Sequence, residues 1–279
     1  MANFTMAFPD GKRKALTLSY DDGVEQDMRL LEIMDKHGLK GTFNLNSAAY
    51  APEGKTWPAG HIHRRMSKAQ ATRLFAQSGQ EIAIHAAEHG DLAVLPPAAA
   101  VWQVMQDKDN LEQQFGRIIR GMAYPFGTVT DALARTLEGC GIAYARTTVS
   151  TGRFTLPENW LKLPATCHHN APELMSLARR FVEEPVRYQP WLFYLWGHSY
   201  EFEANDNWAV IETFAAFAGG RADVWYATNI EIRDYIQAWR SLCTSADGSR
   251  IFNPSGQTLW IQAGDTAQPV APGQQITLL

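Results

Sequence analysis

The chain has 279 residues, of which 46% are hydrophobic and 19% are charged, enough apolar material for a sizeable core. Its 25 lysines and arginines against 29 aspartates and glutamates give a net charge of −4, which offers no basic surface to nucleic acid or an anionic membrane. No apolar run reaches the ~20 residues of a membrane span, and the first residues lack the apolar core of a signal peptide. Three isolated cysteines fit a reducing compartment. We therefore expect a soluble, cytoplasmic protein that binds neither nucleic acid nor membranes.

Segments with strand and helix patterns alternate along most of the chain. The predicted strands are residues 14–20, 41–46, 81–84, 121–124, 142–146, 191–196 and 224–226. The predicted helices are residues 27–37, 67–78, 96–115, 131–138, 173–184, 208–218 and 230–242. This alternation is typical of an α/β fold with a parallel sheet built from βαβ units. At this length a single TIM-like (β/α) barrel is the economical way to close such a sheet.

The composition changes after residue 242. Residues 244–279 are rich in turn-forming residues and contain short β-like runs at 259–261 and 276–278. We interpret residues 1–243 as the barrel and residues 244–279 as a small β-rich C-terminal segment. This segment packs against the barrel or against a partner subunit, and the sequence leaves a homodimer open.

Five polar side chains follow the C-terminal ends of three predicted strands: Asp21 and Asp22, His85 and His89, and His198. In a (β/α) barrel this rim is where active sites are assembled, because all strands end at one mouth. We therefore expect the five to lie together although more than a hundred positions separate them in the chain.

His85 and His89 have the spacing i, i+4, which on one helical turn places both imidazoles on the same side, where they can bind one cation. A carboxylate completes a set of two histidines and one carboxylate with open positions, which suits a catalytic zinc, iron, cobalt or manganese ion. The neighbouring Asp21 and Asp22 repel each other unless a cation binds one of them, and the other can then stay ionised as a base. The alternative interpretation is a polar turn that caps the next helix.

Four motifs occur in order: TLSYDDG at residues 17–23, HAAEH at 85–89, YPFG at 124–127 and LWGH at 195–198. Together they resemble the polysaccharide deacetylases of carbohydrate esterase family 4, the NodB-homology domain, over most of the predicted barrel. The resemblance implies a distorted (β/α)7 barrel and the metal-dependent removal of acetyl groups from sugars.

The resemblance also implies individual roles. Asp21 matches the general base and His198 the general acid, and the metal ligands are Asp22, His85 and His89. The substrate and oxyanion contacts are the backbone N–H of Phe126, the adjoining Tyr124, the apolar wall Leu195, and Trp196, which can stack on a sugar face. The cofactor is one divalent ion, with zinc first and cobalt, manganese, iron or nickel as alternatives.

The chain departs from the family pattern at several positions. Ala123 stands where the family usually has an arginine that holds the base, and Ala86 stands where it has Ser or Thr. No fourth motif is recognisable, so the aspartate that tunes the acid histidine is unassigned, and Trp160 or Trp208 is a candidate for that motif's aromatic residue.

Four further histidines are predicted to lie outside the metal site. His168 and His169 are adjacent and are expected to point in different directions, in local hydrogen bonds or a substrate loop. His61 and His63 are flanked by arginines that disfavour a bound cation, and a solvated loop is predicted for them.

Three functions are compatible with these residues. The leading hypothesis is a metal-dependent hydrolase that removes N- or O-linked acetyl groups from an oligo- or polysaccharide. The alternative is a metal-dependent amidohydrolase that acts on a small cyclic amide, like an allantoinase or imidase, which Ala123 and a cytoplasmic location favour. The third, an inactive sugar-binding module, is disfavoured because base, acid and metal ligands are all present.

Overall fold

A computed structural model describes residues 4–278. Its main sheet has nine strands, all paired in parallel, in the order β7-β6-β5-β4-β3-β2-β9-β8, and β10 also pairs with β2. The bounds are β2 (Lys14–Asp21), β3 (Gly41–Leu45), β4 (Glu81–Ile84), β5 (Gly121–Ala123), β6 (Tyr144–Ser150), β7 (Leu163–Ala165), β8 (Cys167–His168), β9 (Trp191–Gly197) and β10 (Val224–Tyr226).

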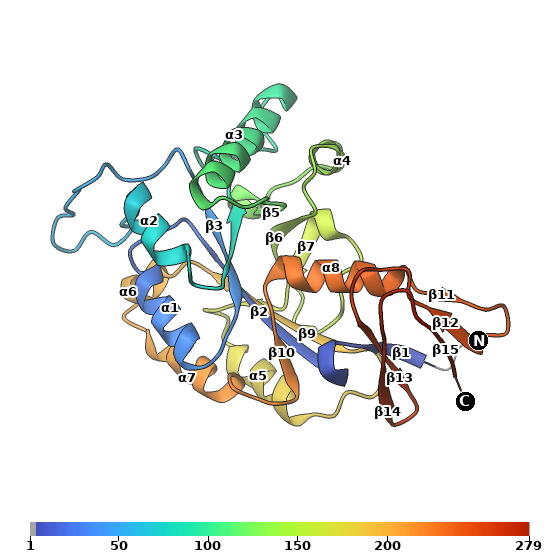
Figure 1. Ribbon diagram of the computed structural model, residues 1–279. Helices are drawn as coiled ribbons and strands as arrows, with labels where there is room; N and C mark the ends of the chain where they lie inside the picture. The colour runs from blue at the N-terminus through green and yellow to red at the C-terminus, as the bar shows by residue number, and fades with distance from the viewer. Residues whose placement is uncertain (1–3, 279) are drawn as a thin grey trace.

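Helices follow most of these strands and cover the sheet from outside (Figure 1). Their bounds are α1 (Asp27–Lys36), α2 (Lys68–Phe75), α3 (Pro97–Phe115), α4 (Asp131–Gly139), α5 (Leu174–Glu183), α6 (Tyr200–Ala204), α7 (Ala209–Ala218) and α8 (Asn229–Arg240). Three short 3-10 helices are η1 (Pro9–Gly11), η2 (Pro125–Gly127) and η3 (Trp160–Lys162). The parallel sheet with alternating helices confirms the predicted α/β class and the distorted (β/α)7 barrel.

Strand β2 is the central strand of the sheet, because it pairs with β3, β9 and β10. All eight of its residues are buried, as expected for a parallel strand that is covered on both faces. Strand β9 is almost as buried, and its run Leu192–Trp196 belongs to the core. The deeply buried β2 and β9 thereby fix the positions of the polar residues at their C-terminal ends.

Most predicted elements are confirmed, with differences at short segments. The predicted strand at 142–146 begins at Tyr144 and continues to Ser150. Strands β7 and β8 were not predicted, because segments of three and two residues are too short to show a period of two. The helix α6 was also missed, because five residues are too few to show the helical period of 3.6 residues.

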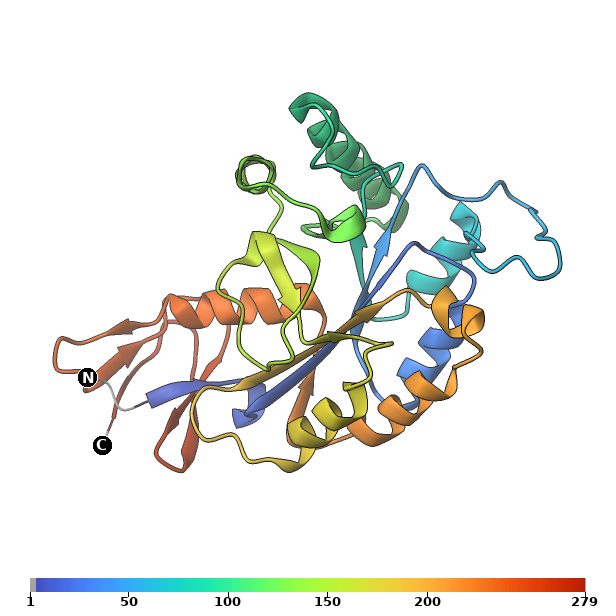
Figure 2. The same cartoon turned by 180° about the vertical axis from the view of Figure 1, so that it is seen from behind.

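The C-terminal segment forms antiparallel sheets together with the start of the chain. Strands β11 (Cys243–Thr244), β12 (Arg250–Phe252) and β15 (Gln275–Thr277) form one sheet, and β1 (Phe4–Ala7), β13 (Leu259–Ala263) and β14 (Thr266–Val270) form the other. Figures 1 and 2 show both sheets on the side of the barrel where α8 ends. The Tyr235 hydroxyl on α8 donates to the carbonyl of Ala7 (2.7 Å) and accepts from the backbone N–H of Trp260 (2.9 Å). The division at residue 243 stays a prediction.

None of the helices within residues 4–278 is both long and apolar enough to cross a membrane.

Candidate active site

The strand ends bring the five predicted site residues to one mouth. Asp21 is the last residue of β2, and His85 and His198 directly follow β4 and β9. The His85 Nε2 and the His198 Nε2 both lie 3.8 Å from Asp21 Oδ2. Residues from three different strands thus surround one buried carboxylate.

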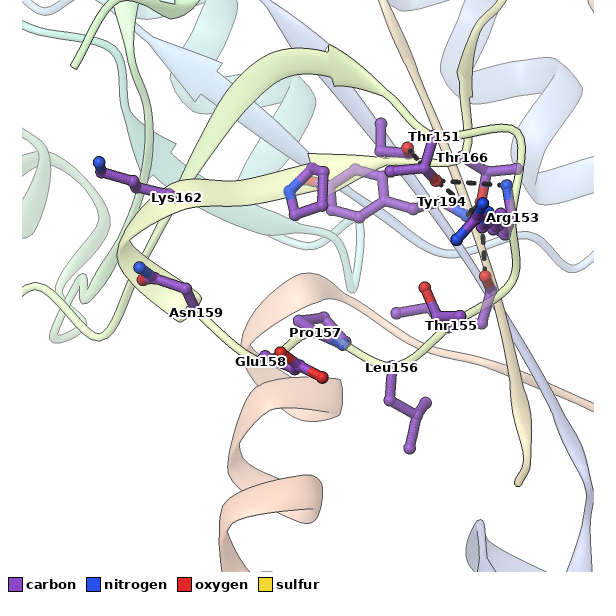
Figure 3. A pocket seen from close by; sticks show the side chains of 13 residues that line it. Thr151, Arg153, Thr155, Leu156, Pro157, Glu158, Asn159, Lys162, Thr166 and Tyr194 are labelled. Carbon is purple, nitrogen blue, oxygen red and sulfur yellow. Dashed lines mark hydrogen bonds between the residues drawn. The ribbon is translucent and has the colours of Figure 1, made fainter. Parts of the chain in front are cut away.

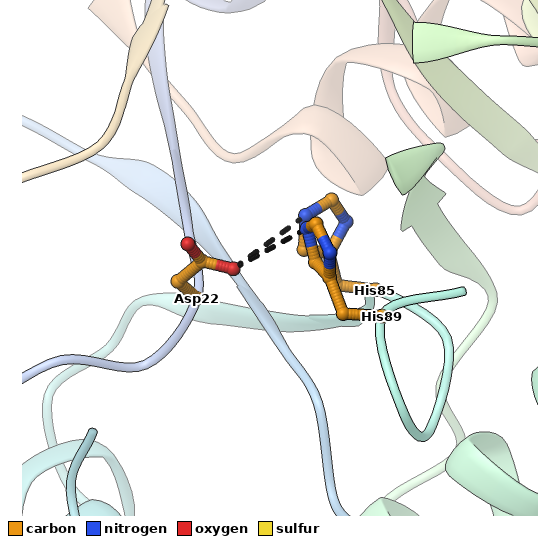
Figure 4. Close-up of side chains that lie close together, drawn as sticks. All are labelled: Asp22, His85 and His89. Atoms are coloured by element: carbon orange, nitrogen blue, oxygen red, sulfur yellow. Dashed lines mark ion pairs between the residues drawn. The ribbon is translucent and has the colours of Figure 1, made fainter. Parts of the chain in front are cut away.

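Asp22, His85 and His89 form a cluster that can hold a metal ion (Figure 4). One ligand atom from each lies within 4.8 Å of the others. Asp22 Oδ1 is 3.6 Å from His89 Nε2 and 3.9 Å from His85 Nε2. His85 Nδ1 faces the carbonyl of Ala123 at 2.9 Å, so this nitrogen carries the proton and leaves Nε2 as a free ligand atom.

The two histidines do not converge through a helical turn, and that prediction was wrong. Residues 85–89 lie in a loop between β4 and α3, and Ala86 and His89 have positive φ angles of 60° and 58°. Left-handed backbone at these two positions, costly for residues other than glycine, folds the loop so that both rings face Asp22.

Burial and charge set the protonation states of the cluster. Burial alone would raise the pKa of Asp22, but the hydrogen bond from His63 and the charge of Arg65 bring this pKa well below its usual value. Burial lowers the pKa of His85 to about 4 and also lowers that of His89. An ionised carboxylate and two neutral imidazoles are the states in which these groups bind metal.

Asp21 is held by Arg146 and Asn44. The Arg146 guanidinium donates to Oδ2, and the Asn44 side-chain amide donates to Oδ1 at 2.8 Å. Burial opposes ionisation of Asp21, but the positive charge of Arg146 and its hydrogen bond lower the pKa of Asp21. Asp21 is therefore a fixed, ionised carboxylate.

Arg146 was not found by sequence reasoning, although it occupies the place left by Ala123. The two residues are direct partners in the parallel pairing of β5 with β6. The guanidinium that the resemblance leads us to expect at position 123 comes here from the neighbouring strand. Only the register between the strands reveals this, because Arg146 itself lies in an ordinary strand pattern.

His198 is held on its far side by Glu201, a second residue that sequence reasoning missed. His198 Nδ1 lies 3.1 Å from Glu201 Oε1, so the proton sits on Nδ1 and Nε2 faces Asp21. Burial lowers the pKa of His198, but the hydrogen bond to Glu201 and the charge of Asp21 outweigh it and raise this pKa. The spacing i, i+3 from His198 was the available signal.

His168 and His169 converge on Glu201, contrary to the prediction that they point apart. Their Nε2 atoms lie 3.2 Å and 2.9 Å from Glu201 Oε2. His168, His198 and Glu201 also have metal-ligand spacing. However, His168 Nδ1 accepts from the backbone N–H of Asn170 at 3.2 Å, so its Nε2 carries the proton and cannot ligate. This group is a hydrogen-bond cluster.

The remaining predicted contacts divide between rim and core. Phe126 is 62% exposed, has φ of 59°, and packs its ring edge-on against His89 at 4.9 Å. Tyr124 is buried and its hydroxyl donates to the carbonyl of Leu161, so its side chain does not face the mouth. Leu195 is fully buried. The Arg146 guanidinium lies over the ring of Trp196. Trp196 was predicted to stack on a sugar, but its ring is already covered on this face.

Trp160 and Trp208 do not join the site. Trp160 is buried in the core cluster under α8, and Trp208 packs between Phe202 and Arg29. His63, predicted to lie in a solvated loop, instead contacts Asp22 with Nε2 at 3.0 Å from Oδ2. His61 is exposed, as predicted.

A separate cavity of about 400 Å³ lies between residues 151–166 and strand β9 (Figure 3). Its lining comes from residues 151–166 and from the first half of β9, and it includes Arg153, Glu158 and Lys162. None of the five clustered site residues lines it. This cavity is therefore separate from the cluster of predicted site residues.

Comparisons with known proteins agree with this geometry. Residues 9–145 match the family model described as polysaccharide deacetylase. No curated protein sequence matches the chain.

Two solved structures share the fold, and a third aligns with only part of the chain. A protein from Mycobacterium smegmatis, proposed to be a polysaccharide deacetylase, has a TM-score of 0.59 at 17% identity, covering 86% of this chain and 96% of its own. A variant of peptidoglycan deacetylase PdaC from Bacillus subtilis has a TM-score of 0.50 at 14% identity, covering 82% and 93%. The deacetylase PplD from Streptococcus pyogenes, at 20% identity and a TM-score of 0.46, aligns over 52% of this chain and 61% of its own length. Residues 9–145 of the chain therefore belong to the polysaccharide deacetylase family, a family of hydrolases.

Proposed function

We propose that the protein is a metal-dependent hydrolase that removes N- or O-linked acetyl groups from an oligo- or polysaccharide. The observation that carries this proposal is the ionised Asp21 set between the Asp22–His85–His89 cluster and His198, with 3.8 Å to the Nε2 atoms of both His85 and His198. A base, an acid and a candidate metal site at one mouth are the parts that hydrolysis of an acetyl group requires.

The three clustered residues fit a divalent ion. Two neutral imidazoles and one carboxylate leave open positions, as in catalytic zinc sites, and zinc is the ion that we propose. When bound there, the ion would supply Lewis-acid chemistry that polarises the acetyl carbonyl and acidifies water. The Ala123 carbonyl on His85 Nδ1 provides the second partner that orients such a ligand.

The chain's own residues move the protons. Asp21 is buried, ionised and fixed by Arg146, and so can accept a proton from the attacking water. His198 has a raised pKa and presents Nε2 to the mouth, where the imidazolium can donate to the leaving amine or alkoxide. We assign oxyanion binding to the backbone N–H of Phe126, because the ring of this residue packs on His89 at the same mouth.

The structure removes one argument for the cyclic-amide alternative. That alternative gained weight from Ala123, where the family usually has an arginine. Arg146 delivers a guanidinium to Asp21 from the paired position on β6. Asp21, the proposed base, therefore has an arginine partner although position 123 is an alanine.

The test is acetate release from a panel of N- and O-acetylated oligosaccharides, before and after removal of metal with a chelator. We expect release by the untreated protein, loss after chelation and recovery with zinc or cobalt. A metal-loaded protein that releases no acetate from any member but opens a cyclic amide would contradict the deacetylase assignment.

A further inference from the structure

A segment outside the four motifs reaches the metal cluster. The loop between β3 and α2 extends outward from the barrel (Figure 1), and its last residues return to the mouth. There His63 Nε2 lies 3.0 Å from Asp22 Oδ2, and Arg65 Nη2 lies 3.0 Å from Asp22 Oδ1. Arg65 also donates to the backbone carbonyl of Asp22 and to the side chain of Asn46. Each oxygen of the Asp22 carboxylate thus has its own partner from this segment.

Arg64, between these two residues, anchors the segment to the barrel. Its guanidinium binds Glu203 of α6 with two bonds, Nη1 to Oε1 at 2.7 Å and Nη2 to Oε2 at 2.8 Å. Its Nε donates to Glu25 at 2.9 Å. The Gln26 side chain donates to the carbonyl of Ile62 at 2.6 Å and to Glu203 at 2.8 Å. A bidentate pair of this kind fixes the orientation of the Arg64 side chain, so residues 62–65 form an ordered edge of the mouth.

The His63 ring is fixed by packing as well as by its hydrogen bond. It meets Tyr200 edge-on at 4.7 Å between ring centres, and Tyr200 lies 5.3 Å from the ring of His198. His63 therefore stands between the metal side and the acid side of the mouth. Its side chain is 40% exposed, which leaves it beside the space that a substrate would enter.

The backbone of Asp22 has an unusual conformation, and the hydrogen bonds from His63 and Arg65 help to hold its side chain in place. Its φ angle is 85°, in a region that residues with a side chain rarely adopt. Oδ1 faces His85 and His89, whereas Oδ2 faces His63. A carboxylate oxygen has two lone-pair directions, so Oδ1 can accept from Arg65 and still bind a cation.

We propose that His63 is a positioning residue for the metal-binding carboxylate. Its Nε2–H holds Asp22 Oδ2, so that Asp22 presents Oδ1 alone to the metal beside His85 and His89. This inference rests on the proposed function, because it requires that Asp22 binds the ion. Partners that orient metal ligands typically contribute about 10–100-fold to metal affinity.

The test measures zinc affinity of the full chain by competition with a chelating indicator. His63→Phe keeps a ring that can pack on Tyr200 but cannot donate to Asp22, and we expect it to bind zinc about 10–100-fold more weakly than the wild type. His63→Gln, whose amide can donate, should recover part of this loss. His61→Ala is the matched control from the same loop, because the His61 side chain contacts the backbone of His63 and the ring of Trp57 and makes no hydrogen bond to Asp22.

A spectroscopic measurement separates positioning from folding. With cobalt in place of zinc, the visible absorption of His63→Phe should differ from that of the wild type, because Asp22 Oδ2 has lost its donor and only Arg65 still orients the carboxylate. His61→Ala should match the wild type. Wild-type zinc affinity and an unchanged cobalt spectrum in His63→Phe would overturn the inference. A wild-type protein that binds neither ion would instead overturn the proposed metal site itself, and the inference with it.

Discussion

The guanidinium of Arg146 is the only basic side chain among residues 4–278 that donates a hydrogen bond to Asp21. Replacing it with methionine leaves the proposed base, Asp21, buried without its ion partner, which raises the pKa of Asp21 and leaves Asn44 alone to hold its side chain. We expect Arg146→Met to lower kcat by about 100-fold, within the usual contribution of a general base, while zinc content stays at the wild-type level. Arg146→Lys keeps the positive charge but loses the planar guanidinium, so its kcat should lie between those of the wild type and Arg146→Met. Steady-state kinetics with metal analysis checks this, and an unchanged kcat would contradict the role.

Glu201 acts on the proposed acid, so its removal should appear in the pH profile. The hydrogen bond from His198 to Glu201 raises the pKa of His198 against the effect of burial. In Glu201→Gln this pKa falls, and His198 loses its proton at a lower pH. The alkaline limb of kcat/KM should therefore move to lower pH, with roughly tenfold less activity than wild type at pH 8 and little difference at pH 6. Superimposable profiles would remove Glu201 from this role.

At the scale of elements, the end of β9 and the loop after β8 are joined by close packing. A Cβ atom built on Gly197 would overlap the ring of His169, which itself lies 2.9 Å from Glu201. Gly197→Ala should therefore displace His169, lower the free energy of unfolding by about 1–3 kcal/mol and lower kcat through Glu201. Gly139→Ala is the control, because it lies in α4 with open space around its Cβ position. Thermal unfolding of both variants tests this prediction. Equal melting temperatures for Gly197→Ala and Gly139→Ala would refute the packing argument.

At the scale of the whole molecule, prediction succeeded where a long periodic segment carries the information. The eight buried residues of β2 and the apolar run of β9 indicated parallel strands, and their polar ends indicated a shared mouth. Arg146 escaped because its role depends on the register of β5 with β6, which no local pattern encodes. His63 escaped because the path of a long loop is fixed by distant ion pairs such as Arg64 with Glu203. Pairings that are local in space but remote in sequence account for most of what was missed.

Stability against pH gives a test of how the whole molecule is held together, because Asp27 joins two of its elements. At the start of α1 it accepts from the Ser199 hydroxyl (2.6 Å) and from the backbone N–H of Val24 (3.1 Å). Burial raises its pKa from 3.8 to about 7. Between these two pH values the unfolded carboxyl is ionised while the folded one keeps its proton, so this group destabilises the fold as pH rises through that window.

Asp27→Asn removes this titration while an amide can still accept from Val24 and donate to Ser199. Relative to the wild type, the variant should therefore gain stability as pH rises from 5 to 7, by at most about 1.4 kcal/mol per pH unit, and keep the gain above pH 7. Asp109→Asn, on the exposed face of α3, is the control for the same change of side chain at the surface. Denaturant unfolding from pH 5 to 8 measures the difference. Since all other titrating groups are common to the proteins compared, parallel curves for Asp27→Asn and the wild type would show that Asp27 is ionised in the folded state throughout.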